Sequence, residues 1–291
     1  MIVAGPVRRP TWYLELPLLL LAYAAFVLTR AAVDRGEPAA TANALLVQDL
    51  ERALHIAIEL PLNHTMLDQP VAVFLTGYFY RLCVLAVPAV LIWLYVSQPT
   101  HYCRLRTVLA VAMLLDVLVV WLFPEAPPRF AQAGIVDHMA AHDILGGAEA
   151  RVPRPGVNLL AAMPSMHVAW TTWCAYAVWT ALRQQAPRTA WAAWLFPLLT
   201  AFVVLVTGHH YVLDILAGFA LVALSGTAVQ TALGFGRHRA FGRHCGSNGE
   251  VSGGIPVRRA GRRARGVRGP AAPFRRRHDP GRAGRRRRGD R

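Results

Sequence analysis

Apolar residues in this chain gather into long runs that alternate with shorter polar segments. Runs of about 17–25 apolar residues are long enough to cross a bilayer as helices. Runs such as 108–123 show almost no polar face, so a soluble helical bundle fits them poorly. The pattern predicts an all-α fold, a polytopic membrane protein with a bundle of six transmembrane helices. The six runs are residues 13–29, 71–96, 107–123, 165–182, 189–206 and 212–233.

Three segments near or between these runs have a distinct character. Residues 40–66 mix leucines with charged and amide side chains, which predicts an amphipathic helix at the outer membrane interface. Segment 124–164 is rich in Gly and Pro near its middle, which predicts an irregular loop that covers one end of the bundle. Run 13–29 could be a signal peptide, but no clear cleavage site follows it, so we expect a retained helix.

The net charge of +15 comes from the end of the chain. Residues 1–235 contain 13 arginines and 13 acids, whereas residues 236–291 contain 18 arginines and 3 acids. The second segment has too few large apolar residues to fold around a core. We expect an N-terminal part over 1–39 with the first helix, a membrane domain over 40–235, and a disordered Arg-rich tail over 236–291. The bilayer, through its anionic lipid, is the expected partner of this tail, and nucleic acid is not.

Basic residues in short loops predict the orientation, because they favour the cytoplasmic side of a membrane. With six helices, the basic loops and the tail all fall on one side, which places both termini in the cytoplasm. The opposite loops contain most of the acids, including Glu51, Glu59 and Glu125. The basic residues of the short loops are Arg8, Arg9, Arg104, Arg106, Arg183 and Arg188.

Thr207-Gly208-His209-His210-Tyr211-Val212-Leu213-Asp214 follows the fifth run. His210 and Asp214 are four residues apart, so they lie on one face of a helix. An ionised Asp214 can accept the Nδ1–H of His210 and leave Nε2 as a nucleophile. A polar pair that only caps the helix start is the alternative.

Two further polar stretches fall on the same, extracytoplasmic side. Pro164-Ser165-Met166-His167 is typical of a helix N-terminus, where free N–H groups and Ser165 can bind an anion and His167 can donate a proton. Arg129 follows Pro127-Pro128, and a guanidinium binds phosphate through two parallel hydrogen bonds. Inside the second run, Arg81 could contact a headgroup or pair with Asp116.

These stretches resemble the type 2 phosphatidic acid phosphatase (PAP2) superfamily, and look most like its branch of inositol phosphorylceramide synthases. The resemblance covers about residues 40–233 and implies a six-helix bundle of PAP2 type. It also implies a membrane lipid phosphatase or phosphotransferase of the cell membrane. Such an enzyme is metal-independent, needs no cofactor and acts on a lipid phosphate or phospholipid at the extracytoplasmic face.

Residue by residue, the resemblance makes His210 the nucleophile, His167 the acid and base, and Asp214 the group that orients His210. Arg129 and Ser165 would bind phosphate. Many members have Lys where this chain has Leu122, Ser-Arg where it has Val203-Val204, and Gly where it has Met166. We therefore expect backbone N–H groups and His209 or Arg154 to help hold the phosphate. A phosphohistidine would form first, and then water or an alcohol would attack it, so hydrolysis and transfer are both open.

Two other classes of protein are alternatives to this interpretation. Membrane di-iron hydroxylases use histidine clusters, and His138 with His142, and His209 with His210, form two such pairs. These pairs are too few, and they face the wrong side. A non-catalytic scaffold or transporter is the other alternative, but the sequence shows no internal repeat of the kind that transporters have.

Overall fold

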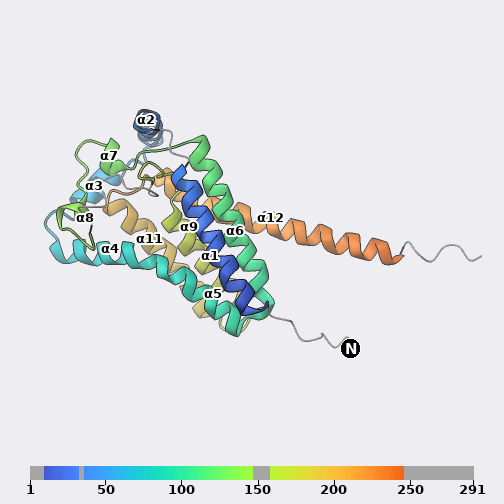
Figure 1. The fold of residues 1–291 in the computed structure, drawn as a ribbon. Helices are drawn as coiled ribbons and strands as arrows, with labels where there is room; N and C mark the ends of the chain where they lie inside the picture. The colour runs from blue at the N-terminus through green and yellow to red at the C-terminus, as the bar shows by residue number, and fades with distance from the viewer. Residues whose placement is uncertain (1–9, 33–35, 147–157, 246–291) are drawn as a thin grey trace, which may run out of the picture. The chain divides into compact units, whose positions relative to one another are not determined.

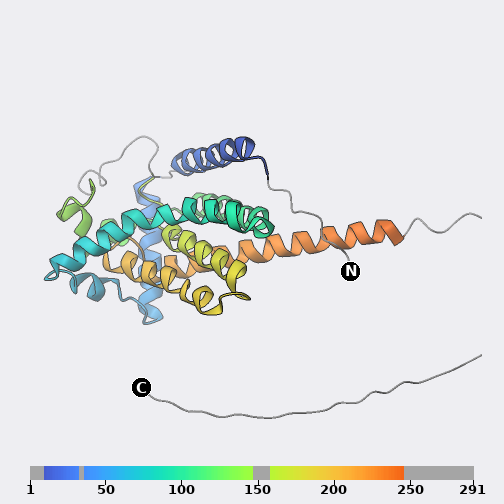
Figure 2. The same cartoon turned by 90° about the horizontal axis from the view of Figure 1, so that it is seen from below.

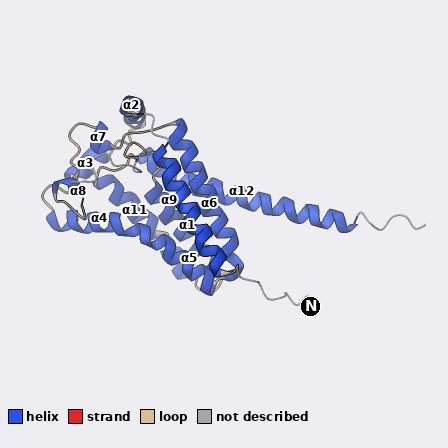
Figure 3. Ribbon diagram, viewed as in Figure 1, coloured by secondary structure: helices blue, strands red, loops and turns tan. Residues whose placement is uncertain are grey.

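The computed structural model describes residues 10–32, 36–146 and 158–245. The chain separates into two units, Met1–His244 and Cys245–Arg291, and the first contains the helical bundle. Regular structure in the described residues is helical, apart from one isolated bridge between Glu125 and Ala161 (Figure 1 and Figure 3). The predicted all-α membrane fold is confirmed.

Five helical stretches of the described chain are long and apolar enough to cross a membrane. The sixth predicted span is α9 (Met166–Leu182), whose 17 residues are about 25 Å long at 1.5 Å per residue, near the lower limit for a span. The five are α1 (Trp12–Ala32), α4 (Pro70–Leu82) joined to α5 (Ala86–Ser97), α6 (Pro99–Leu122), α10 (Pro187–Ala192) joined to α11 (Leu195–Val206), and the first part of α12 (Val212–Cys245).

Two runs predicted as continuous helices are interrupted, and proline explains both breaks. A 3-10 turn at Cys83–Leu85 joins α4 to α5, and Pro88 lacks the N–H that would bond to the carbonyl of Val84. A turn at Ala193-Trp194 separates α10 from α11, and Pro197 likewise cannot donate to Ala193. At the other end of the chain, α12 continues to Cys245, and residues 246–291 of the predicted tail lie outside the described residues.

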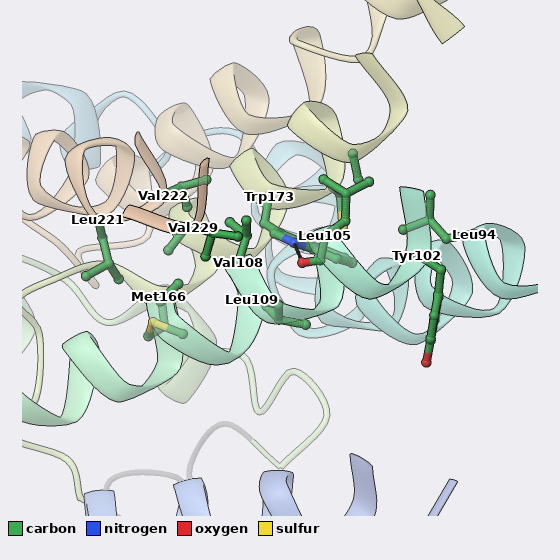
Figure 4. Close-up of a cluster of buried hydrophobic side chains, with 14 of the residues drawn as sticks. Leu94, Tyr102, Leu105, Val108, Leu109, Met166, Trp173, Leu221, Val222 and Val229 are labelled. Atoms are coloured by element: carbon green, nitrogen blue, oxygen red, sulfur yellow. Dashed lines mark hydrogen bonds between the residues drawn. The ribbon is translucent and has the colours of Figure 1, made fainter. Parts of the chain in front are cut away.

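Helix α9 lies at the centre of the bundle, and most of its residues are buried. Trp173 is fully buried and donates its indole N–H to the carbonyl of Leu105 in α6, at 2.9 Å (Figure 4). Leu221 and Val222 of α12 belong to the same apolar cluster. A helix that is apolar on all sides is stable when other helices cover all of its faces. Helix α9 is covered in this way, and the other helices are arranged around it.

Helix α1 lies at the edge of the bundle beside α6 (Figure 2). Two ion pairs join these helices. Arg106 pairs with Glu15 near the start of α1, and Arg30 pairs with Asp116 near its end, with 3.5 Å between Nε and Oδ2. Of the two partners suggested for Arg81 by its sequence, Asp116 is therefore taken by Arg30.

The predicted amphipathic helix over 40–66 is two helices, α2 (Glu37–Ala53) and α3 (Glu59–His64). His55 has a φ of 59°, a left-handed conformation that ends the first of them. The inner face of α2 packs on other protein segments, because Ala40, Ala44 and Val47 form a buried cluster with Tyr211. Thus α2 covers the end of the bundle at which α12 begins.

The segment after α6 is largely irregular, as predicted, but contains the single turns α7 (Pro128–Ala131) and α8 (His138–Ala141). Its two ends are tied together, since the N–H of Glu125 donates to Leu160 and the N–H of Ala162 donates to Glu125. The glycines and prolines at 147–156, and Arg154, lie outside the described residues. The two hydrogen bonds between Glu125 and residues 160 and 162 bring the segment that contains Arg129 close to the start of α9.

Gly218 marks the closest approach of α12 to the start of α9. A Cβ at this position would lie 2.7 Å from the carbonyl oxygen of Ser165, a backbone atom that cannot rotate away. We expect Gly218→Ala to lower the free energy of unfolding by about 1–3 kcal/mol. The control is Gly226→Ala in the same helix, where the nearest atom is 3.7 Å away. Equal thermal unfolding temperatures of the two variants in detergent would contradict this packing.

Candidate active site

His210 and Asp214 meet at the start of α12. His210 Nδ1 lies 3.2 Å from Asp214 Oδ2, and the backbone N–H of Tyr211 donates to the same oxygen at 2.9 Å. Both side chains are buried. The predicted contact is therefore present, but His210 lies in the turn before the helix. Asp214 holds this turn and the imidazole together, and the Nε2 of His210 is left for another partner.

Three buried glutamates surround the first turn of α12, and the sequence had placed all three in outer loops. Glu51 accepts the N–H of Leu213 at 2.7 Å, and Glu59 accepts the N–H of Val212 at 3.2 Å. Glu125 is fully buried beside Asp214. Burial, with Glu59 next, raises the pKa of Glu51 to about 9. Burial, and then the charge of Asp214, raises the pKa of Glu125 to about 12.

The raised pKa of Glu51 predicts how stability depends on pH. The Glu51 carboxyl loses its proton near pH 4.5 in the unfolded chain but keeps it to about pH 9 in the folded protein. The free energy of unfolding therefore falls as pH rises through this range. We expect the thermal unfolding temperature in detergent to fall from pH 5 to pH 9, and to fall less in Glu51→Gln. Asp49→Asn, an exposed acid in the same helix, is the control. An equally steep fall in Glu51→Gln would contradict the prediction.

His167 lies in the first turn of α9, and its ring centroid is 6.3 Å from that of His210. Ser165 is the N-cap of this helix, and its hydroxyl accepts the N–H of Val168. The backbone N–H of Ser165 donates to the carbonyl of Asp214 at 3.0 Å. This last bond fixes the two histidine segments relative to each other. The side chain of Ser165 is buried and does not line the space between His167 and His210.

Arg129 is held at the same place by its backbone and by its side chain. Its N–H donates to the carbonyl of Gly208 at 2.9 Å, and its guanidinium Nε lies 3.6 Å from Asp137 Oδ2. The guanidinium also lies over the ring of Phe130. Gly208 has a φ of 70°, a conformation that favours glycine, and this turn places the carbonyl toward Arg129.

A cavity of about 270 Å³ lies between these residues. Its polar end is lined by His167, His209, His210, Arg129 and Arg30. The rest is lined mainly by aromatic and aliphatic side chains of α1, α4, α9 and the segments that precede α7 and α9, together with Asn158. The structure therefore brings together both predicted catalytic histidines and the predicted phosphate-binding arginine.

His209 lines the cavity in a state that the sequence did not specify. Its Nδ1 lies 3.0 Å from the carbonyl oxygen of Thr207, so Nδ1 carries a proton and Nε2 a lone pair. Burial first, and Arg129 next, lower the pKa of His209 well below its usual value. A neutral His209 accepts a hydrogen bond through Nε2, which suits the hydroxyl of a substrate or acceptor better than an ionised phosphate oxygen.

Tyr80 and Arg30 are site residues that sequence reasoning missed. The ring of Tyr80, from α4, stacks on His167 with centroids 4.1 Å apart and contacts His209 at 4.3 Å. Arg30 comes from the end of α1. Arg81, next to Tyr80, is not part of the cavity lining. No motif marked Tyr80, while Arg30 was visible as a charge that ends an apolar run.

The histidine pair at 138 and 142 lies elsewhere. His138 is buried, with its Nε2 3.1 Å from the carbonyl oxygen of Asn63. His142 is exposed beside Phe74. In the described parts of the chain, no group of three or more His, Cys, Asp or Glu residues is arranged to hold a metal ion. The di-iron alternative thus finds no set of ligands there.

The helical bundle and its buried histidine pair define an integral membrane protein with a polar site at one end of its helices. Residues 45–228 match the sequence model of the PAP2 superfamily. The match covers more than half of the chain, which therefore belongs to the PAP2 superfamily. Comparisons with curated proteins and with solved structures give no match. Membership in the superfamily suggests an activity of the phosphatase type.

Proposed function

We propose that this protein is a metal-independent lipid phosphatase or phosphotransferase that works through a phosphohistidine. One observation carries the proposal: the ring centroids of His167 and His210 lie 6.3 Å apart on a cavity that arginines also line, and Asp214 contacts Nδ1 of His210. A phosphorus atom between the two rings would have a nucleophile on one side and a proton donor on the other.

In the first step, Nε2 of His210 forms a bond to phosphorus and the bond from phosphorus to the alcohol oxygen breaks. The proton on His167 passes to the leaving alkoxide. Asp214 accepts the Nδ1–H of His210 and stabilises the positive charge that the ring gains. Arg129 and the N-terminus of α9 stabilise the charge on the phosphoryl oxygens, with Ser165 as the residue that fixes this N-terminus.

In the second step, an oxygen nucleophile attacks the phosphohistidine, and the bond from nitrogen to phosphorus breaks. His167 takes the proton of the attacking group. Water gives hydrolysis, whereas an alcohol such as inositol gives transfer, as in the synthase-like branch that the motifs resemble. The neutral His209 is placed to accept a hydrogen bond from the attacking hydroxyl.

The charge distribution supports an extracytoplasmic site in the cell membrane. The cavity lies at the end of α1, at the start of α9 and at the start of α12. Arg104 and Arg106 lie in the first turns of α6, and Arg183 and Arg188 lie between α9 and α11. Arg106 pairs with Glu15 at the far end of α1, and Arg183 directly follows α9, so basic residues lie at the end of the bundle opposite the cavity. Basic residues favour the cytoplasmic side.

The test uses purified protein in detergent with EDTA and a mixed panel of lipid phosphates and phosphoinositides. Inositol, diacylglycerol and ceramide are added or left out as acceptors, and products are measured by mass spectrometry. Release of free phosphate would establish hydrolysis, and a new phospholipid would establish transfer. His142→Ala, an exposed histidine outside the cavity, is the control and is expected to behave as wild type. No turnover of any lipid by the wild type would contradict the proposal.

A further inference from the structure

One face of α1 forms a wall of the cavity. Its members are Tyr23, Phe26, Val27, Arg30 and Ala31, and this spacing of three and four residues is that of a single helix face. The family match begins only at residue 45. Helix α1 thus contributes to the site although it lies outside the residues that match the family model.

Arg30 ends this face at the polar part of the cavity. Its Nη2 donates to the carbonyl of Ala161 at 2.7 Å, and its Nε has no hydrogen-bond partner among the described residues. Asp116, at 3.5 Å from that Nε, is fully buried, while 20% of the Arg30 side chain is exposed. The guanidinium is therefore anchored at one edge and faces the cavity that Arg129 and the histidines also line.

The remaining residues of the face are apolar and lead away from the histidines. From Arg30 to Tyr23 the helix advances seven residues, about 10 Å at 1.5 Å per residue. Tyr23 is 54% exposed, and the outer residues of α1 around it are exposed leucines, as expected of a surface that faces lipid. The cavity thus runs from a cationic end to the lipid-facing side of the bundle.

We propose that α1 completes the substrate site: Arg30 binds the phosphate together with Arg129, and Tyr23, Phe26 and Val27 line the path of the substrate's hydrocarbon chain. This inference rests on the proposed function. A phosphate monoester carries up to two negative charges, and Arg129 already shares its charge with Asp137, so a second guanidinium balances the site. A soluble phosphate ester would use only the polar end.

A purely structural role of Arg30 would be to neutralise Asp116, and the fold contains a matched control for it. Glu15 and Arg106 form the other ion pair between α1 and α6, about 22 Å from Arg30 along α1 at 1.5 Å per residue, and they do not line the cavity. Removing both partners of a buried pair leaves no uncompensated charge, so each double variant should fold.

The test measures binding of a long-chain phosphonate analogue of phosphatidic acid, which is not hydrolysed, to the full-length protein in detergent. We expect Arg30→Met/Asp116→Asn to bind it on the order of tenfold to hundredfold more weakly than Asp116→Asn alone. Glu15→Gln/Arg106→Met should bind it as the wild type does. Equal affinities of the double variant and Asp116→Asn would overturn the role of Arg30, as would absence of binding by the wild type.

A second comparison tests whether the site prefers a phosphate group that carries a hydrocarbon chain. The long-chain phosphonate should bind at least about tenfold more tightly than methylphosphonate, because only the former buries a chain against α1. Val27→Trp should reduce this preference by filling the path. Equal binding of the two phosphonates would overturn the apolar path. Because these readouts need no turnover, a protein that binds the analogue but turns over no lipid would contradict the proposed function and leave this inference standing.

Discussion

We expect His210→Ala to lower turnover of the preferred lipid phosphate by about 10⁴-fold or more, since removal of a nucleophile abolishes the covalent route and leaves only binding and electrostatic effects. Among the histidines that line the cavity in the described residues, His210 is the one whose far nitrogen contacts a carboxylate. The measurement is the initial rate in detergent at saturating substrate.

The loss must be separated from a loss of folding, because His210 is buried. The variant should bind the long-chain phosphonate with nearly wild-type affinity and elute as wild type in size-exclusion chromatography. His142→Ala, which lies outside the cavity, should keep its full rate. Turnover by a well-folded His210→Ala protein within about tenfold of the wild type would be too small a loss for a missing nucleophile and would remove His210 from that role.

We expect His167→Ala to lower the rate on an alkyl phosphate by about 10²–10⁴-fold, the usual contribution of a general acid. The loss should be much smaller for p-nitrophenyl phosphate, whose leaving group departs without a proton. The 6.3 Å between the rings of His167 and His210 leaves room for a phosphoryl group between them, as this assignment requires.

The comparison between the two leaving groups is the informative result. An acid that protonates the leaving group gives a loss that depends on the leaving group, whereas a residue that only packs against Tyr80 gives the same loss for both substrates. An equal loss on the two substrates would therefore contradict the assignment of His167. Tyr80→Phe, which keeps the stacked ring, is the matched control and should affect the two substrates equally.

The sequence was sufficient for the parts of the site that depend on helix ends. His167, His210 and Arg129 each adjoin an apolar run, so the count of runs placed them at one end of the bundle, and the structure brings them to one cavity. The contact between His210 and Asp214 was predicted from spacing alone. These features depend on where apolar runs end and on short spacings, both of which the sequence shows, although His210 lies in the turn before α12 and not in the helix.

Features that depend on packing between distant segments could not be derived in this way. Glu51, Glu59 and Glu125 belong to segments that look solvated, but α2 and α3 fold over the first turn of α12 and bury them. Arg30 and His210 are 180 residues apart, and only the position of α1 beside α6 brings both to one cavity. The spacing of apolar residues predicts that a helix is buried, but it does not predict which other helix packs against it.

We expect the phosphoryl group to pass through His210. The most direct test of this expectation mixes the wild-type protein with a lipid phosphate, stops the reaction with alkali to preserve phosphohistidine, and locates the modification by peptide mass spectrometry. We expect one phosphoryl group on the peptide that contains His210, transient in the wild type and missing in His210→Ala. Steady turnover without a phosphorylated peptide, or with the phosphoryl group on another residue, would contradict it.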